Sequence, residues 1–360
     1  MDFGAGVNSS QESAVDLETV LDDPLWFLDA VDPAGCGFSF VKTSRALLQE
    51  SAFLDHRMSE ATGPRADFTL TAGDFATIES PHSAYDPAGF IFHTSFCRST
   101  LLARALHREG ASFSLKEPGA MVSLAHGLRA AGAAVGEGER AGLIDAVLTL
   151  LGRPLAQGER MLIKPSNFAN ALLPAVLARG GRVLLMYSEL RPLLLSILKR
   201  GEEGRIFVRR LFNALRMDPV AVANIPAPQA MLFTDLEVAA LVWRQQMETF
   251  VEALQSWPDA GLRSLDADVL RARPEETVRA AFDFFEIEAD EKDVREVVQG
   301  AVFMQDSKQA DRPYSPAREA EMAREAERVF ADSIARTLDW ASQARLRTDI
   351  ALPLARPLLG

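Results

Sequence analysis

Between residue 89 and residue 265 the chain alternates short apolar runs with longer amphipathic stretches, and this alternation restricts the possible folds more than any other feature. Each apolar run has the length of a β-strand, and the runs lie at residues 90–93, 112–116, 160–164, 182–187 and 262–265. Apolar residues at helical spacing predict helices at residues 99–108, 141–151, 167–179, 192–200, 205–216 and 235–257. Strands that alternate with helices in this way form a parallel sheet with helices on both faces. The sequence therefore predicts an α/β protein with three layers, in which helices flank a central, mostly parallel sheet.

The segments outside this pattern differ from it in composition. Residues 1–20 are small, polar and acidic, so we expect a disordered tail. Within residues 21–88, the stretch 40–57 carries apolar residues at helical spacing, which predicts a helical N-terminal lead-in packed on the core. The α/β domain then covers residues 89–345, and residues 346–360 form a C-terminal tail.

Local signals mark several boundaries of the predicted elements. Thr234 and Glu237 form a capping box at the start of the longest predicted helix. Pro274 opens a further helix, and Pro316 opens a long charged one. The Ala- and Gly-rich stretch 130–138 carries no such signal, and we predict a flexible surface linker there.

Composition and charge narrow the range of partners. The chain of 360 residues is 48% apolar and 24% charged, as is typical of globular proteins, and its net charge of -12 argues against a broad basic surface for nucleic acid. Cys36 and Cys97 are the only cysteines, too few for a disulfide framework or a four-cysteine metal site. No Lys or Arg precedes Lys42, so we expect no export signal, and the apolar stretch 183–198 is too short and polar to span a bilayer. We expect a cytoplasmic protein that binds neither nucleic acid, membrane nor metal.

The segment 90–106 has the pattern of a phosphate-binding strand, turn and helix. An apolar strand is followed by a turn of small polar residues and then by an amphipathic helix. Main-chain N–H groups at such a helix start bind phosphate oxygens, and the hydroxyls of Ser99 and Thr100 would add donors. Residues 97–100 align with the last four positions of G-x-x-x-x-G-K-[ST], although the glycines of that motif are missing. A capped helix after a buried strand would give the same pattern.

This segment resembles the 5'-phosphosulfate loop of PAPS-dependent sulfotransferases and their bacterial relatives, where PAPS is 3'-phosphoadenosine 5'-phosphosulfate. The stretches that carry the resemblance occur in the family's order, at residues 92–106, 115–118, 163–167, 190–196, 266–277 and 284–285. The resemblance implies a fold of the P-loop NTPase type. The chain departs from the family at Phe96, where the loop normally has Lys or Arg, at Arg98, where it has Gly, and at Ser188, which replaces the first Arg of the 3'-phosphate motif.

The resemblance also implies catalytic roles for three residues. Lys164, at the end of a predicted strand, would stabilise charge on the bridging oxygen, and Arg98 would supply the charge that Phe96 cannot. Glu117, at the end of the second strand, would act as the base near the acceptor. A solvated strand end is the alternative interpretation of Lys116 and Glu117.

Cofactor-binding roles follow from the same resemblance. The 5'-phosphate would lie on Thr94, Ser95, Phe96, Cys97, Arg98, Ser99 and Thr100. Arg191 and Ser196 would hold the 3'-phosphate, or else would be an ordinary arginine and serine of a helix. A polar loop with Lys308, Arg312 and Tyr314 would close over the cofactor. We interpret His93 as a buried histidine at a strand end, held by hydrogen bonds.

Three functional hypotheses remain open on the sequence. The first is a sulfotransferase that moves a sulfuryl group from PAPS, without a metal, to a hydroxyl or amine of a small-molecule or glycan acceptor. The second is a P-loop kinase or NTPase that uses Mg-ATP, with Arg98 in place of the motif's lysine and Glu189 as the only acid beyond the strand at 182–187. The third is a non-catalytic protein that binds a nucleotide or a partner through the altered loop.

Overall fold

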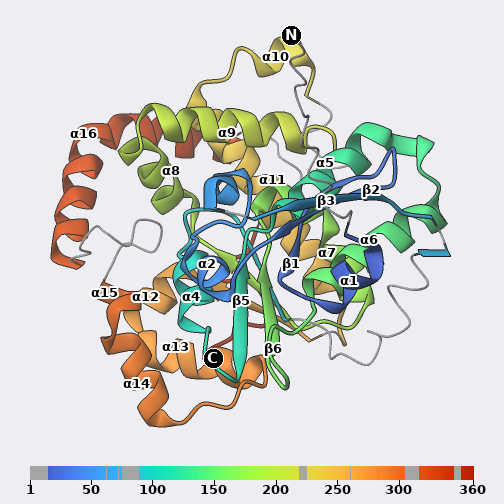
Figure 1. Cartoon of the computed structure of the whole chain (residues 1–360). Helices are drawn as coiled ribbons and strands as arrows, with labels where there is room; N and C mark the ends of the chain where they lie inside the picture. Colours follow the sequence, from blue (N-terminus) through green and yellow to red (C-terminus); the bar gives the residue numbers. More distant parts are fainter. Residues whose placement is uncertain are drawn as a thin grey trace, which may run out of the picture.

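A five-stranded parallel sheet forms the centre of the molecule (Figure 1). The computed structural model describes residues 15–61, 63–71, 73–74, 89–218, 225–259, 261–304, 316–343 and 350–360. The strands are β4 (Gly89–His93), β5 (Ser112–Lys116), β6 (Arg160–Lys164), β7 (Val183–Tyr187) and β8 (Leu262–Asp266), in the order β5-β6-β4-β7-β8. All neighbouring pairs in this sheet are parallel. The predicted α/β fold with three layers is confirmed, and so are all five predicted strands.

The period-two alternation of each strand divides the sheet into two buried faces. Ile91, Leu162 and Leu184 pack into one apolar cluster, while Phe92 and Leu185 pack into the other. The first cluster also contains residues of α4 (Ser99–Ala105), α12 (Ala267–Ala272), α13 (Pro274–Phe284), α14 (Glu291–Gln299) and α15 (Ala301–Met304). The second cluster contains residues of α5 (Gly119–Ala131), α6 (Glu137–Leu151), η3 (Asn167–Leu172), α7 (Leu173–Ala178), α8 (Leu190–Lys199), α9 (Glu202–Leu215) and α11 (Asp235–Ser256). Helices therefore cover both faces, as expected for a parallel sheet.

Helix starts agree with the signals read from the sequence. The capping box at α11 is present, because the Thr234 hydroxyl accepts from the Glu237 N–H and the Glu237 carboxylate accepts from the Thr234 N–H. Pro274 is the first residue of α13, and α16 (Pro316–Gln343) begins at Pro316 and packs on α8 and α11. A short helix, α10 (Ala227–Ala230), precedes α11. Among the described residues, no helix has the length and apolar character needed to cross a bilayer.

The predicted helical lead-in is wrong, because its core is an antiparallel sheet of three strands. The strands are β1 (Trp26–Asp32), β2 (Gly37–Lys42) and β3 (Arg65–Thr69). The helices described in this region are short, namely α1 (Leu17–Asp22), α2 (Arg45–Glu50) and η1 (His56–Ala61). Phe38 and Phe40 are both buried and Ser39 between them is not, which is the period of a strand. The disordered tail expected at 1–20 is contradicted from Leu17 onward, and residues 1–14 lie outside the described residues.

Two glycines allow the small sheet to approach the main domain closely. A Cβ on Gly127 of α5 would lie 2.3 Å from Cδ of Pro33, and a Cβ on Gly119 would lie 2.9 Å from the Asp29 carbonyl oxygen. Helix α5 therefore packs against β1 with almost no space between them. Helix α5 and η2 (Gly132–Ala134) also correct the prediction of a linker at 130–138, since α5 continues to Ala131.

A buried arginine fastens the N-terminal segment to the core. The Arg153 guanidinium, just beyond α6, donates to the carbonyls of Val20, Leu21 and Trp26 at 2.9, 2.8 and 2.8 Å. These donors satisfy carbonyl groups at the end of α1 that have no partner within that helix. The N-terminal sheet is thus an integral part of the fold.

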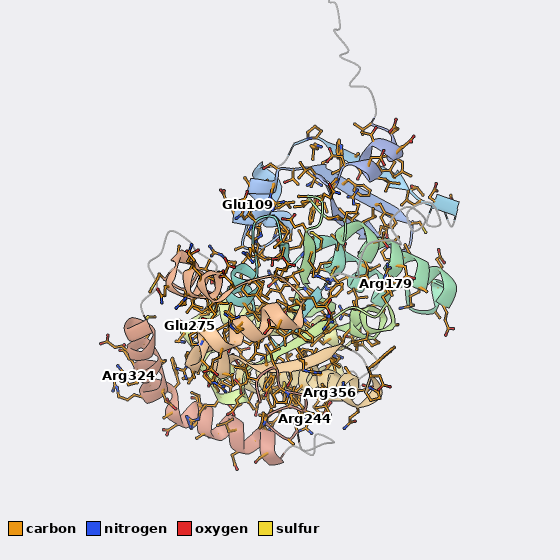
Figure 2. All side chains as sticks on the ribbon, turned by 90° about the horizontal axis from the view of Figure 1, so that it is seen from below. Glu109, Arg179, Arg244, Glu275, Arg324 and Arg356 are labelled. Carbon is orange, nitrogen blue, oxygen red and sulfur yellow. The ribbon has the colours of Figure 1, made fainter. Side chains whose placement is uncertain are left out.

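The C-terminal residues cover the edge of β8. The Ser264 N–H donates to the Arg356 carbonyl at 2.9 Å, and the Leu358 N–H donates to the Ser264 carbonyl at 2.8 Å. Arg356, labelled in Figure 2, donates to the carbonyls of Trp257 and Pro258. The tail predicted at 346–360 therefore packs on the sheet over residues 350–360, which protects an edge that would otherwise be open.

Candidate functional site

The chain changes direction across the sheet between β4 and β7. From β4 it passes towards β5 and from β7 it passes towards β8, and ligands of open α/β sheets bind at such a switch point, beyond the carboxyl ends of the strands. The turn after β4 and the residue after β7 meet here, since Ser188 Oγ donates to the Phe96 carbonyl at 3.5 Å and the Thr94 N–H donates to the Met186 carbonyl at 3.1 Å. The predicted phosphate-binding turn therefore lies where a fold of this kind binds ligands.

The turn itself has an unusual backbone. Ser95, Phe96 and Arg98 have φ values of 74°, 51° and 61°, in the left-handed region that residues with a Cβ seldom adopt. Such strain persists where the surrounding structure enforces it, often at functional sites. Main-chain N–H groups in a turn that contains left-handed residues can point together and bind an anion. Arg98, at the position where the sequence resemblance leads one to expect Gly, thus adopts the left-handed conformation that Gly adopts most readily.

The turn offers hydrogen-bond donors to a ligand. The N–H groups of Thr94 and Ser95 are bound within the protein, whereas those of Thr100 and Leu101 belong to the first turn of α4, where a helix supplies no acceptor of its own. The buried hydroxyl of Thr94 also has no partner among the described residues. Buried donors without acceptors are rare in native proteins and call for a ligand or water. Five of the predicted turn residues are buried, namely Thr94, Ser95, Cys97, Ser99 and Thr100.

Lys164 and Glu117 form a buried ion pair beside the turn. Lys164 ends β6 with only 1% of its surface exposed, and its Nζ lies 2.5 Å from Glu117 Oε1. Glu117 follows β5 with a φ of 55°, and its N–H donates to the Lys164 carbonyl at 2.7 Å. Because β5 and β6 are parallel neighbours, their carboxyl ends bring the two side chains together. Their catalytic roles remain predictions.

His93 connects the ion pair to the turn. Its Nδ1 accepts from the Ser95 N–H at 3.1 Å. That Nε2 lies 3.0 Å from Lys164 Nζ and 3.8 Å from Glu117 Oε1. The interpretation of His93 as a buried histidine held by hydrogen bonds is confirmed, and its contacts reach both candidate catalytic side chains.

A second buried lysine lies on the neighbouring strand. Lys116 Nζ donates to the carbonyls of Leu48 and Gln49 at 3.1 and 2.7 Å, at the end of α2. Burial, with the charges of Arg104 and Lys164 nearby, lowers the pKa of Lys116 to about 7. The alternative of a solvated strand end is wrong for Lys116, because its side chain is buried. The carboxyl edge of β5 and β6 thus carries two lysines and one carboxylate, which favours an anionic ligand.

The side chain of Phe96 forms part of an apolar wall. Its ring packs edge-on against Phe207 of α9, with centroids 5.5 Å apart, and the Arg200 guanidinium lies 5.2 Å above it. Phe96 therefore joins the turn to α8 and α9. The sequence resemblance leads one to expect Lys or Arg at this position. Arg98, the residue before α4, is partly exposed.

The residues predicted to hold the 3'-phosphate lie on α8. The Arg191 guanidinium forms an ion pair with Glu327 of α16, and both side chains are nearly half exposed. Ser196 is partly buried on the same helix. The contact made by Arg191 is therefore with α16 and not with the turn. Arg312, with Lys308 and Tyr314, falls outside the described residues.

A group of buried amides behind the turn was missed from the sequence. Asn170 Nδ2 donates to the His93 carbonyl at 3.2 Å, and Gln246 Oε1 accepts from Asn167 and Asn170 at 3.0 and 3.3 Å. The Asn170 Oδ1 has no partner in the described structure. The signal was available, because Gln246 interrupts an apolar helix face and buried amides are conspicuous.

Comparison with known proteins adds no relative. No family model matches the chain, and no curated protein matches it. Among the described residues, no cluster of three His, Cys, Asp or Glu side chains could hold a metal ion. The fold and site together define an α/β protein with a strained, donor-rich turn and a buried Lys–Glu pair at the carboxyl edge of its sheet.

Proposed function

We propose that the protein is a sulfotransferase-like enzyme that binds PAPS at residues 94–100 and transfers its sulfuryl group to a hydroxyl or amine acceptor. The observation that carries this proposal is the buried Lys164–Glu117 pair, 2.5 Å apart, beside a turn that leads into the N-terminus of α4. A cation and a carboxylate held together at the carboxyl edge of the sheet are the two groups that such a transfer requires.

Each partner of the pair has a separate task. Negative charge develops on the bridging oxygen during sulfuryl transfer, as in phosphoryl transfer, and the Lys164 ammonium would stabilise it. The Glu117 carboxylate would accept the proton of the acceptor. In the resting protein the two side chains neutralise each other, so substrate binding must separate them. His93, in contact with both, would keep Lys164 in place during that step.

Nucleotide binding would depend mainly on the main chain of the turn. The N–H groups of Cys97, Thr100 and Leu101 and the Thr94 hydroxyl would donate to the 5'-phosphate, with Arg98 adding positive charge. Arg191 would reach a 3'-phosphate after leaving Glu327. That exchange costs little, because an exposed ion pair contributes only about 0–1 kcal/mol.

The Mg-ATP hypothesis has less support from these residues. A kinase or NTPase needs a carboxylate to hold the metal beside the phosphates. Glu117 is already paired with Lys164, and Glu189, beyond β7, is exposed. The test below still gives this hypothesis a distinct outcome.

Titration calorimetry with PAP (adenosine 3',5'-bisphosphate), ADP and ATP, with and without Mg²⁺, tests the proposal. Tight binding of PAP without metal, and weaker binding of ADP, is the expected result. A preference for Mg-ATP would favour the kinase hypothesis, and no binding of any nucleotide would favour the non-catalytic one. Arg98→Ala should weaken PAP binding, whereas Arg271→Ala, which removes an exposed arginine of α12, should leave it unchanged.

A further inference from the structure

The strands that carry His93 and Lys164 separate at their carboxyl ends. Strands β4 and β6 pair at only two positions, the second of which joins Phe90 to Ile163, whereas β5 and β6 pair at five. Pro165, directly after Lys164, has no N–H with which to extend the ladder. The backbone pairing of these two strands thus stops before His93, and another contact must fix the distance between their ends.

Buried amides bridge the separation. Gln246 of α11 accepts through Oε1 from Asn167 Nδ2 at 3.0 Å and from Asn170 Nδ2 at 3.3 Å. Asn170 Nδ2 also donates to the His93 carbonyl at 3.2 Å. Both asparagines lie on η3, the segment that follows β6, and His93 ends β4. None of the four side chains belongs to a residue more than 4% exposed, so these bonds form away from competing water.

The orientation of the Gln246 amide follows from its other hydrogen bond. Nε2 donates to the Val242 carbonyl, one turn earlier in α11, at 3.1 Å. An exchange of the nitrogen and oxygen would place oxygen against oxygen at Val242 and nitrogen against nitrogen at both asparagines. A single oxygen atom of α11 therefore holds Asn167 and Asn170 together.

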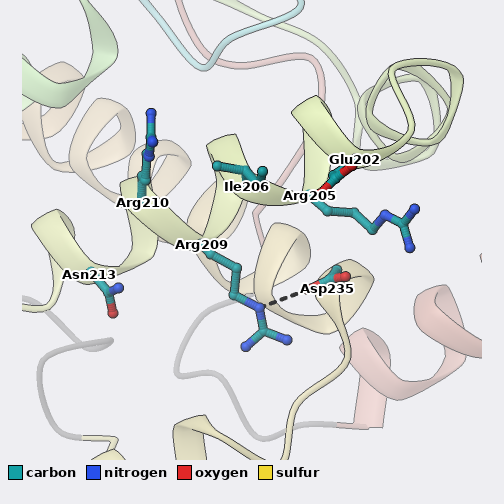
Figure 3. A pocket seen from close by; sticks show the side chains of 7 residues that line it. All are labelled: Glu202, Arg205, Ile206, Arg209, Arg210, Asn213 and Asp235. Atoms are coloured by element: carbon teal, nitrogen blue, oxygen red, sulfur yellow. Dashed lines mark hydrogen bonds and ion pairs between the residues drawn. The ribbon is translucent and has the colours of Figure 1, made fainter.

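Helix α11 is itself fixed at several points. Trp243 Nε1, three residues before Gln246, donates to the Ser188 carbonyl beyond β7 at 2.8 Å. At the start of the helix, Asp235 pairs with Arg209 of α9 at 2.7 Å, a contact drawn as a dashed line in Figure 3. Helix α11 thus contacts the end of β7 directly and the ends of β4 and β6 through η3. It is a rigid support along the carboxyl edge of the sheet.

We propose that Gln246 is a positioning residue, which sets the distance between the ends of β4 and β6 through Asn170. His93 Nε2 lies 3.0 Å from Lys164 Nζ, and His93 Nδ1 accepts from the Ser95 N–H at 3.1 Å. A shift of the His93 backbone therefore displaces the lysine and the turn together. This inference rests on the proposed function, because it assigns Gln246 to the site of that reaction. Gln246 acts through Asn170 and His93, and not by contact with the substrate.

Gln245 provides a matched control on the same helix. Gln245 and Gln246 are 2% and 1% exposed, and Gln245 Nε2 donates to the Leu215 carbonyl at the end of α9 at 3.1 Å. Methionine is unbranched like glutamine and adapts to its surroundings. Gln246→Met and Gln245→Met therefore each remove one buried amide from α11, but only the first removes the bridge between β4 and β6.

Nitrogen-15 NMR of the histidine rings, in the full chain without nucleotide, tests the positioning itself. The chain has five histidines, and the His93 signals are those that disappear in His93→Gln. We expect Gln246→Met to shift these signals and Gln245→Met to leave them unchanged. Gln246→Glu should keep them, because burial favours the neutral acid, which accepts as the amide does and donates to Val242. If Gln246→Met does not fold, Asn170→Ala gives the same readout and should shift the signals.

Turnover with PAPS tests the consequence for the reaction. Gln246→Met should lower kcat by about 10- to 100-fold, because small displacements of a catalytic group are costly. PAP affinity should change less, since the main-chain donors at the start of α4 remain. Unchanged His93 signals in Gln246→Met, equal shifts in Gln245→Met, or shifted signals with full turnover would overturn the proposal. Absence of PAP binding to the wild type would overturn the proposed function instead, and the His93 signals would still decide whether Gln246 positions the site.

Discussion

The two sides of the switch point are built in different ways. On the side of β5 and β6, hydrogen bonds and an ion pair within the protein hold the charged groups of Lys116, Glu117 and Lys164, and both lysines are buried. On the side of β7 and α8, Arg191 is 46% exposed, and its partner Glu327 comes from the distant helix α16. One side is fixed before any ligand arrives, and the other is adjustable.

This difference matches the two ends of the proposed cofactor. Charge stabilisation at the transferred group requires side chains that do not reorganise during reaction, and a buried site provides this. Recognition of a distant phosphate requires only a mobile cation, which an exposed arginine provides at little cost. Substitutions on the two sides should therefore differ greatly in size of effect.

The largest effect is expected at Lys164. Lys164→Met should lower the turnover number by about 10²–10³, since one preorganised donor at the developing charge is lost. It should also lower the free energy of unfolding by about 3–5 kcal/mol, because the Glu117 carboxylate is left buried without its cation. Steady-state kinetics and urea denaturation measure the two effects.

A second substitution, at Glu117, separates the loss of turnover from the loss of stability. Glu117→Gln added to Lys164→Met should restore most of the stability and none of the activity. Lys292→Met, at an exposed lysine of α14, serves as the control and should change neither quantity. Full activity in Lys164→Met would remove Lys164 from the mechanism.

The next effect concerns Lys116 and depends on pH. Its pKa falls from 10.5 to about 7 on folding, so between these values the unfolded chain holds a proton that the folded protein has released. Stability from this group therefore rises with pH across that window and is constant below it. The contribution amounts to a few kcal/mol, at about 1.4 kcal/mol for each pKa unit.

Lys116→Met removes this pH dependence. We compare the unfolding free energy of the variant with that of the wild type. The difference, variant minus wild type, should be largest below about pH 7 and should fall as the pH rises to about 10. A difference that does not change with pH would mean that folding does not lower the pKa of the buried Lys116 amine.

The fixed side could be read in part from the sequence, because Lys164 ends one apolar run, Glu117 follows another, and parallel strands bring their carboxyl ends to one edge of the sheet. The contact between the two side chains depends on β5 and β6 being neighbours, which the sequence did not predict. The Arg191–Glu327 pair joins residues far apart in sequence and depends on how α16 packs, which no local pattern encodes. The antiparallel sheet was missed because Phe38 and Phe40 give only two positions of alternation before the chain turns helical at α2. Helix α5 was not predicted, because Gly119 and Gly127, which allow close packing on the N-terminal sheet, lower the helix propensity of this stretch.

A smaller effect is expected from Gly119, which links the N-terminal sheet to the fixed side. Gly119→Ala places a Cβ 2.9 Å from the Asp29 carbonyl, so α5 must shift just beyond Glu117. We expect a loss of about 1–3 kcal/mol in unfolding free energy, with reduced turnover. Gly138→Ala in α6, where a Cβ meets nothing within 4 Å, should be neutral or stabilising by up to about 1 kcal/mol. Equal effects at the two glycines would show that the close contact with β1 is unimportant.

The smallest effect is expected on the adjustable side, where the direction of the change in PAP affinity is the decisive observation. Glu327→Gln frees Arg191 from its ion pair, so PAP affinity should increase by about two- to fivefold, the value of an exposed pair. ADP affinity should stay the same, because ADP has no 3'-phosphate for Arg191 to bind. Arg191→Ala should weaken PAP and leave ADP unchanged, and calorimetry on both nucleotides measures these differences. If Glu327→Gln changed PAP and ADP affinity equally, Arg191 would have no role at the 3'-phosphate, and the adjustable side would be ordinary helix packing.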